Sequence, residues 1–313
     1  MKTGFNLWLA LFLCFISMNS PAANEPTGSV LRGRIIDSFG KPIPGATIKI
    51  HGVTRTDSTT WPAYDIDTSA TSDAKGEFVI SASKPFVSAE GAVHAPGFAT
   101  GLFAGWTAGD KIHELKLITG AALRGKLVRD GKPVANAELH LDNFGRESGS
   151  HHLHATAITD EQGRFLFNHL PTYRTPFLYA AMKSLSERGA LSKRPVEVCE
   201  NNSTNDIGEV ILQPSYEVSG QIRLSDGKPI PVQSKLLLNR QMVGRMDGVS
   251  SSLGADGKFR FVGVPAEIIM IQFRLPGYEL TPRDHLLKSG PATNLNIVSN
   301  ITNLMIEMKP TSK

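Results

Sequence analysis

The sequence has few of the residues that cross-link or anchor a protein. Of its 313 residues two are cysteines, Cys14 and Cys199, and the first lies in the N-terminal segment discussed below. Cleavage of that segment would leave Cys199 alone, so no intrachain disulfide is expected, and stability must come from apolar burial. Aromatic residues make up 7% of the chain. Outside the N-terminal segment there is no apolar run of about 18 residues, so no membrane-spanning helix is expected in the rest of the chain.

The excess of one sign of charge over the other is also small. Lys and Arg number 33 and Asp and Glu number 29, which gives a formal net charge of +4. The basic excess lies in residues 215–313, where it is spread along the segment rather than clustered. Because a nucleic-acid partner requires a concentrated basic face, no nucleic-acid partner is expected.

The N-terminus has the parts of a secretory signal. Lys2 supplies positive charge, residues 7–16 are apolar, and Ser20-Pro21-Ala22-Ala23 provides small residues for cleavage. The apolar stretch is shorter than the roughly 20 residues that a spanning helix needs. We therefore expect residues 1–23 to be a cleaved signal peptide and the mature chain to be secreted or periplasmic. An uncleaved anchor is the alternative.

One phrase occurs three times along the chain. A Gly-x-apolar stretch and a following Gly-Lys-Pro-apolar turn begin at Gly33, Gly125 and Gly220, about 92–95 residues apart. Apolar and polar residues alternate around each glycine, which is the period of a half-buried strand. Repetition at this spacing predicts three units, with bounds 24–119, 120–214 and 215–313.

Each copy also contains a turn that enters a strand at a phenylalanine. The turns read Asp73-Ala74-Lys75-Gly76, Asp160-Glu161-Gln162-Gly163 and Gly254-Ala255-Asp256-Gly257. Glycine inside a strand is unfavourable unless another group approaches closely. We therefore expect each phenylalanine to cover the strand glycine of its own copy: Phe78 over Gly33, Phe165 over Gly125, and Phe259 over Gly220.

Short alternating segments with regular turns favour an all-β chain of three tandem antiparallel Ig-like sandwiches. The second copy lacks a Pro-Gly turn, and its residues 179–185 are expected to form a short helix. The joints near Thr119-Gly120 and residues 213–215 are short and not rich in Gly and Ser. Short joints of this composition predict a stiff rod of three units.

These phrases resemble the carboxypeptidase regulatory-like domain, a transthyretin-like Ig-type β-sandwich. The resemblance covers nearly all of the mature chain as three copies, of which the third diverges most. It implies a non-catalytic domain, because in that family the domain accompanies metallocarboxypeptidases, outer-membrane receptors, adhesins and polysaccharide-handling proteins. A binding or spacing role follows by analogy alone.

The sequence contains none of the common catalytic phrases, such as Gly-x-Ser-x-Gly or His-Glu-x-x-His. We therefore expect a protein that is not an enzyme and has no cofactor. The expected function is a secreted or periplasmic binding or spacer protein, with an extracellular glycan or an envelope protein as its partner.

Two other functions remain open. Exposed flat rings can stack on sugars, so Trp61, Tyr64 and Trp106 could make the first unit a carbohydrate-binding protein. In the alternative, these rings fold back and pack against the sandwich.

The histidine run His151-His152-Leu153-His154 suggests a metal-binding protein or metalloenzyme. On a strand, His152 and His154 project from one face and could share Zn²⁺ or Cu²⁺ if a third ligand arrives. His140, Asp142 and His169 lie in the same unit. The alternative is a polar histidine-rich surface without a metal.

Overall fold

The computed structural model describes residues 29–60, 66–67, 69–142, 154–172, 175–198, 200–240, 247–280 and 292–311. Within these residues the regular structure is β-strand, apart from one four-residue α-helix and one 3-10 turn. The expected all-β fold is therefore confirmed. None of the helices found in these ranges is long and apolar enough to cross a lipid bilayer. The expected signal peptide, residues 1–23, lies outside the described residues.

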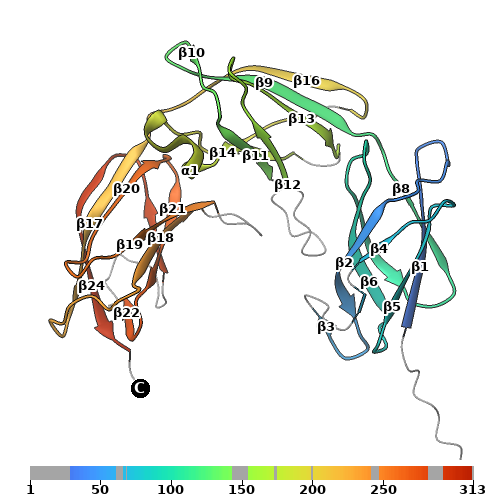
Figure 1. Cartoon of the computed structure of the whole chain (residues 1–313), viewed down its shortest axis with the longest axis horizontal. Helices are drawn as coiled ribbons and strands as arrows, with labels where there is room; N and C mark the ends of the chain where they lie inside the picture. Colours follow the sequence, from blue (N-terminus) through green and yellow to red (C-terminus); the bar gives the residue numbers. More distant parts are fainter. Residues whose placement is uncertain are drawn as a thin grey trace, which may run out of the picture.

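Buried apolar side chains form three separate clusters in the described part of the chain. Their members come from residues 31–117, 123–212 and 218–308, and we call these parts unit 1, unit 2 and unit 3. Each sheet takes its strands from a single unit. Figure 1 shows the units one after another along an arch, with unit 2 at its top.

Unit 1 is a sandwich of the sheets β5-β1-β8 and β3-β2-β6-β7, with β4 added to β2. Its core takes apolar side chains from both sheets. Its strands are β1 (Ser29–Ile36), β2 (Thr47–Thr54), β3 (Thr59–Thr60), β4 (Ser69–Thr71), β5 (Glu77–Ala82), β6 (Ser88–His94), β7 (Gly101–Thr107) and β8 (Ile112–Lys116).

Unit 2 repeats this plan with the sheets β10-β9-β13, to which β16 is added at β9, and β12-β11-β14-β15. The helix lies within the expected stretch but is shorter, because residues 177–180 continue a strand. The elements are β9 (Ala121–Arg129), β10 (Lys132–Pro133), β11 (Glu138–Asp142), β12 (His154–Ile158), β13 (Arg164–Leu170), β14 (Phe177–Ala180), α1 (Met182–Leu185), η1 (Ser186–Arg188), β15 (Arg194–Pro195) and β16 (Thr204–Ile211).

Unit 3 has the sheets β20-β17-β24-β22 and β19-β18-β21-β23. Its strands are β17 (Tyr216–Leu224), β18 (Lys235–Arg240), β19 (Gly248–Ser252), β20 (Lys258–Val264), β21 (Ile268–Arg274), β22 (Tyr278–Leu280), β23 (Ala292–Asn296) and β24 (Ile301–Pro310).

The sandwiches are not wholly antiparallel. The closing strand of each unit pairs parallel with the first strand, as β8 does with β1, β16 with β9 and β24 with β17. The strand before each closing strand belongs to the opposite sheet. The chain therefore crosses the sandwich to reach the first strand, and a crossover connection permits parallel pairing where a tight hairpin does not.

The Asp-Gly turns are built as their residue types predict. The carboxylate of Asp73 accepts hydrogen bonds from the amides of Lys75 and Glu77, at 2.8 and 2.9 Å. Asp160 accepts from Gln162 and Arg164 in the same way. In unit 3 the aspartate stands later in the phrase, and Asp256 accepts from the Lys258 amide at 3.2 Å. These bonds fix the entry to the strand that carries the phenylalanine.

Candidate functional site

The strand glycines of units 1 and 2 lie beneath phenylalanine rings. Gly33 is in register with Phe78, and Gly125 is in register with Phe165. A methyl group added at Gly33 would lie 2.5 Å from the Phe78 ring, and one at Gly125 would lie 2.8 Å from Cζ of Phe165. Any side chain would therefore clash, which accounts for a glycine inside each strand.

The third copy differs. Gly220 is in register with Phe259, but the atom nearest to an added methyl group is the carbonyl oxygen of Leu304, at 2.0 Å. The pairing of β17 with β24 changes register beside Gly220, and this brings the Leu304 backbone close. The glycine of unit 3 is therefore required by a neighbouring backbone rather than by the ring.

Of the three aromatic candidates in unit 1, only Trp106 lies among the described residues. Trp61 and Tyr64 lie outside the described residues. Trp106 packs against the core of unit 1, with its ring stacked on Phe103 and His113 at centroid distances of 4.3 and 5.1 Å. A sugar-binding ring needs an open face, so this geometry favours the packing alternative for Trp106.

The histidine candidate lies in a polar cluster on the sheet of β11 and β12. Nδ1 of His154 contacts the carboxylate of Asp142, and its Nε2 lies 3.2 Å from Nδ1 of His140. Nε2 of His140 lies 3.2 Å from Oε1 of Glu138. His152 lies outside the described residues. His169 lies apart from this cluster, with Nδ1 3.0 Å from the carbonyl oxygen of Thr119.

Asp142 is the buried centre of this cluster. Burial opposes its ionisation, but hydrogen bonds from His154 and Tyr179 outweigh burial and lower the pKa of Asp142 below its ordinary value. Burial and the same hydrogen bond raise the pKa of the Tyr179 hydroxyl well above its ordinary value. The cluster therefore holds an aspartate anion against a neutral tyrosine.

Unit 3 contacts unit 2 through a buried arginine that could not be identified from the sequence. Arg240, at the end of β18, is 1% exposed. Within unit 3 its guanidinium lies 3.4 Å from Asp247 and 3.3 Å from Glu267. Across the joint it donates to the carbonyl oxygens of Ala180 and Leu191, at 3.3 and 3.2 Å. A charge buried this deeply requires such compensation.

The carboxylates that hold Arg240 also bind unit 2. Asp247 accepts from the amide of Met182, the first residue of α1, and Glu267 accepts from the amide of Lys193. Burial raises the pKa of Asp247 above its ordinary value, against the opposing charge of Arg240. The Arg240 guanidinium also lies over the Tyr179 ring, 4.8 Å from its centroid. Unit 2 thus contributes mainly backbone groups to this joint.

The joint between units 1 and 2 is also packed. A methyl group added at Gly120 would lie within 3 Å of His169 and Leu170 backbone atoms and of the Ala99 side chain. The Gly120 amide donates to the Asn201 side chain at 2.7 Å. Beside this joint lies a cavity of about 210 Å³ between the two units, lined by residues that include Phe98, Thr100, Leu141, His154, His169 and Val198.

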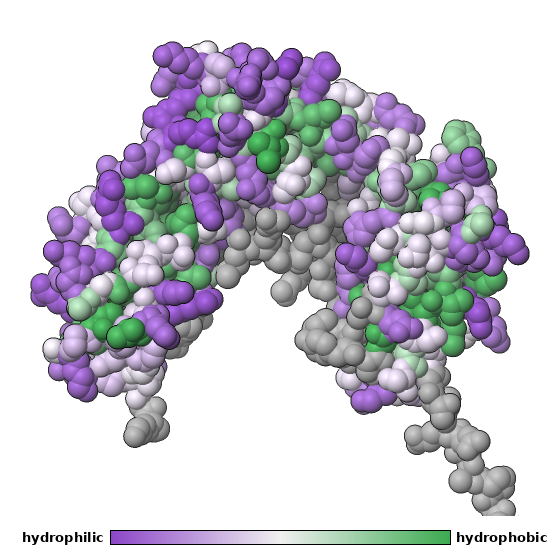
Figure 2. Space-filling view, viewed as in Figure 1, coloured by the Kyte–Doolittle hydropathy of each residue, from purple (hydrophilic) through white to green (hydrophobic). Residues whose placement is uncertain are grey.

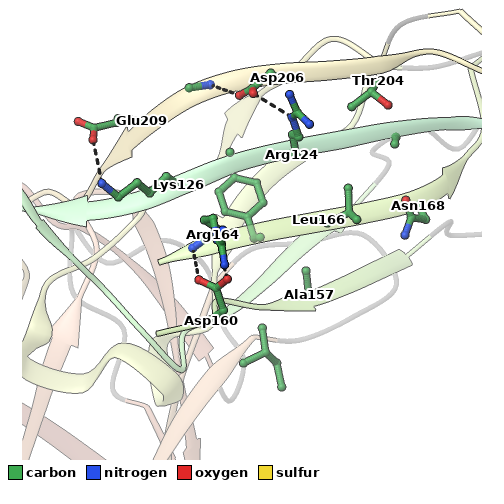
Figure 3. A pocket seen from close by; sticks show the side chains of 15 residues that line it. Arg124, Lys126, Ala157, Asp160, Arg164, Leu166, Asn168, Thr204, Asp206 and Glu209 are labelled. Atoms are coloured by element: carbon green, nitrogen blue, oxygen red, sulfur yellow. Dashed lines mark hydrogen bonds and ion pairs between the residues drawn. The ribbon is translucent and has the colours of Figure 1, made fainter. Parts of the chain in front are cut away.

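A wider, open groove of about 900 Å³ runs along unit 2 (Figure 3). The view shows charged side chains standing up from β9, β13 and β16 along its length. The apolar side chains of Ile158 and Leu166, 68% and 49% exposed, line it as well. Its ion pairs join Arg124 to Asp206, Lys126 to Glu209, and Arg164 to Asp160, at 2.8–3.3 Å.

The corresponding sheet of unit 3 carries a similar groove of about 600 Å³. Arg260 and Glu217 form an ion pair of 2.9 Å there, and Met305 is an exposed apolar side chain. Figure 2 shows hydrophilic residues over most of the outer side of the arch, with smaller apolar patches between them. The grooves are therefore mixed polar and apolar surfaces on a largely hydrophilic face.

Comparison with known proteins gives no family. No protein-family model matches the chain, and no curated protein matches its sequence. The implied carboxypeptidase regulatory-like family is therefore not confirmed, although the β-sandwich fold that it implied is observed.

Several solved structures are similar over most of the chain. The Bacillus anthracis TIE protein is 17% identical over 91% of this chain, with a TM-score of 0.26, and this chain spans about half (51%) of its length. A streptococcal ancillary pilin is 11% identical over 91% of this chain and 100% of its own, with a TM-score of 0.30. BcpA, the major pilin subunit of Bacillus cereus, is 10% identical over 91% and 100%, with a TM-score of 0.22. At these TM-scores the likeness carries no functional argument, and the fold class is established by this chain's own sheets.

Proposed function

We propose that this protein is a non-catalytic, secreted or periplasmic spacer that holds a protein-binding surface on a stiff arch of three β-sandwiches. The observation that carries the proposal is the joint at Arg240. A flexible string of domains leaves such charges in water, whereas this joint buries a guanidinium and two carboxylates against another unit's backbone. Opening the joint would break the hydrogen bonds that Arg240 and Glu267 make with the unit 2 backbone, so the joint resists bending.

The packed joint at Gly120 supports the same function. A residue without a side chain stands where two units approach within contact distance. The linker is therefore part of the packing rather than a free tether, and the first two units hold a defined angle.

The groove of Figure 3 supports a protein partner. Charged pairs beside exposed Ile158 and Leu166 match the mixed composition of protein–protein interfaces. The glycan alternative receives less support, because the Trp106 ring is partly buried and stacks on Phe103 and His113. Secretion or periplasmic location rests on the leader sequence at residues 1–23.

Stiffness can be measured directly. Spin labels at Lys84→Cys in unit 1 and Val298→Cys in unit 3, in a Cys199→Ser background, report the distance across the arch by double electron–electron resonance. Both positions are exposed. We expect one narrow distance distribution. A broad distribution, like that of a chain with flexible linkers, would refute the spacer function.

Binding is tested separately. Arg124→Glu with Lys126→Glu changes the charge of the groove without touching the core. We expect capture of an envelope protein by the wild-type chain to be lost in this variant and kept in the matched surface variant Lys75→Glu in unit 1. Equal capture by both variants would exclude the groove, and binding to a glycan panel alone would favour the carbohydrate alternative.

A further inference from the structure

Two imidazoles of unit 2 face each other on neighbouring strands. His154 begins β12 and stands opposite Asp142 of β11, and His140 lies two residues earlier on β11. Nδ1 of His140 and Nε2 of His154 are 3.2 Å apart. The ring centroids are 4.9 Å apart with an angle of 29° between the planes. The rings therefore converge from one side instead of lying end to end.

The outer nitrogen of each ring lies against a carboxylate. Nδ1 of His154 contacts Asp142, and Nε2 of His140 lies 3.2 Å from Glu138. A neutral imidazole carries one N–H, and a carboxylate is only an acceptor when ionised. When each ring carries its N–H on its outer nitrogen, the two facing nitrogens both present lone pairs. A proton or a metal cation between them then removes the repulsion of the lone pairs.

We propose that His140 and His154 form a binding site for a divalent cation of tetrahedral preference, Zn²⁺. With Zn–N bonds of about 2.0–2.1 Å, nitrogens 3.2 Å apart subtend roughly 100–105° at the metal, close to the tetrahedral angle. A square-planar Cu²⁺ requires neighbouring ligands nearer to 90°. Carboxylates on the outer nitrogens are the usual partners of metal-binding histidines, because they fix the tautomer and the ring orientation.

The surroundings of the pair favour a cation. Asp142 is 3% exposed and is held by the hydroxyl of Tyr179, so a negative charge is fixed beside the site. His154 also lines the cavity of about 210 Å³ between units 1 and 2.

Water completes the coordination. No group of three or more His, Cys, Asp or Glu side chains in the described ranges is arranged to hold a metal. The described residues therefore supply two histidine ligands, and we assign the other two positions of the tetrahedron to water. Such a site binds an exchangeable ion rather than a structural one.

Calorimetric titration of the untagged full chain with Zn²⁺ tests the site. We expect about one equivalent to bind, and we expect His154→Gln and His140→Gln each to weaken binding at least about tenfold. The matched control is His169→Gln in the same unit, which should bind as the wild type does. Fewer than about 0.1 equivalents bound, or unchanged binding in the double variant His140→Gln/His154→Gln, overturns the proposal. The second result would move the metal to other histidines, such as His151 and His152.

A measurement on the wild-type chain avoids dependence on folded variants. Long-range ¹H–¹⁵N correlation spectra identify the nitrogen of each imidazole that binds metal. On addition of Zn²⁺, Nδ1 of His140 and Nε2 of His154 should shift, while the outer nitrogens stay protonated. Shifts confined to other histidines refute the site.

Discussion

Replacing Arg240 by methionine tests how the last two units are joined. The side chain is 1% exposed, and its partners Asp247 and Glu267 are 8% and 7% exposed. Removing the cation leaves two buried carboxylates without their counter-charge, and breaking a buried ion pair from one side costs about 3–5 kcal/mol. Loss of the guanidinium over Tyr179 adds about 1 kcal/mol.

The matched control is Arg260→Met. Arg260 pairs with Glu217 at 2.9 Å, but its side chain is 61% exposed. An exposed pair contributes about 0–1 kcal/mol, so this variant should unfold almost as the wild type does. Urea titration followed by far-ultraviolet circular dichroism measures both free energies of unfolding.

Hydrogen exchange locates the effect. The amides of Met182 and Lys193 donate to Asp247 and Glu267, so Arg240→Met should lose protection at these two amides. The triple variant that also contains Asp247→Asn and Glu267→Gln should recover part of the stability, because no buried charge remains unpaired. Unfolding free energies within about 1 kcal/mol of each other for Arg240→Met and Arg260→Met would refute this account of the joint.

Two further predictions concern the strand glycines and pH. Gly220→Ala should lower the melting temperature more than Gly125→Ala. The methyl group added at Gly220 meets the Leu304 backbone at 2.0 Å, whereas the one added at Gly125 meets the Phe165 ring at 2.8 Å. The reverse order of melting temperatures would contradict this account of the packing. Partial desolvation on an exposed strand end and the charge of Lys49 lower the pKa of His94. The stability that His94 confers is thus complete above the unfolded-state pKa of about 6.5 and lost as pH falls below it. Urea titrations at about pH 7.5 and pH 5 should show a larger loss in the wild type than in His94→Gln, and equal losses would reject this assignment.

The fold could be predicted because its signals are local. Alternating residues around Gly33 and the turn at Asp73 act over a few positions, and both are observed as expected. The parallel closing strands could not be predicted in this way, because strand direction depends on which sheet the previous strand joins.

The contacts at the joint between units 2 and 3 could not be predicted from the sequence either, because they also depend on how distant segments pack together. Arg240 ends an ordinary apolar strand, and its carboxylate partners Asp247 and Glu267 follow at spacings that match no motif. The pairing of His154 with His140 likewise depends on the register of β11 with β12. The histidine run did indicate one of the two strands, β12, which begins at His154.

The backbone character of the Arg240 joint has a consequence for how the chain is assembled. Unit 2 precedes unit 3 in the chain, and domains generally fold in order of synthesis. The carbonyl oxygens of Ala180 and Leu191 are thus already set in place when β18 is added. Unit 3 produced alone would expose its charged end to water. Unit 3 therefore completes its folding against backbone groups that unit 2 has already positioned.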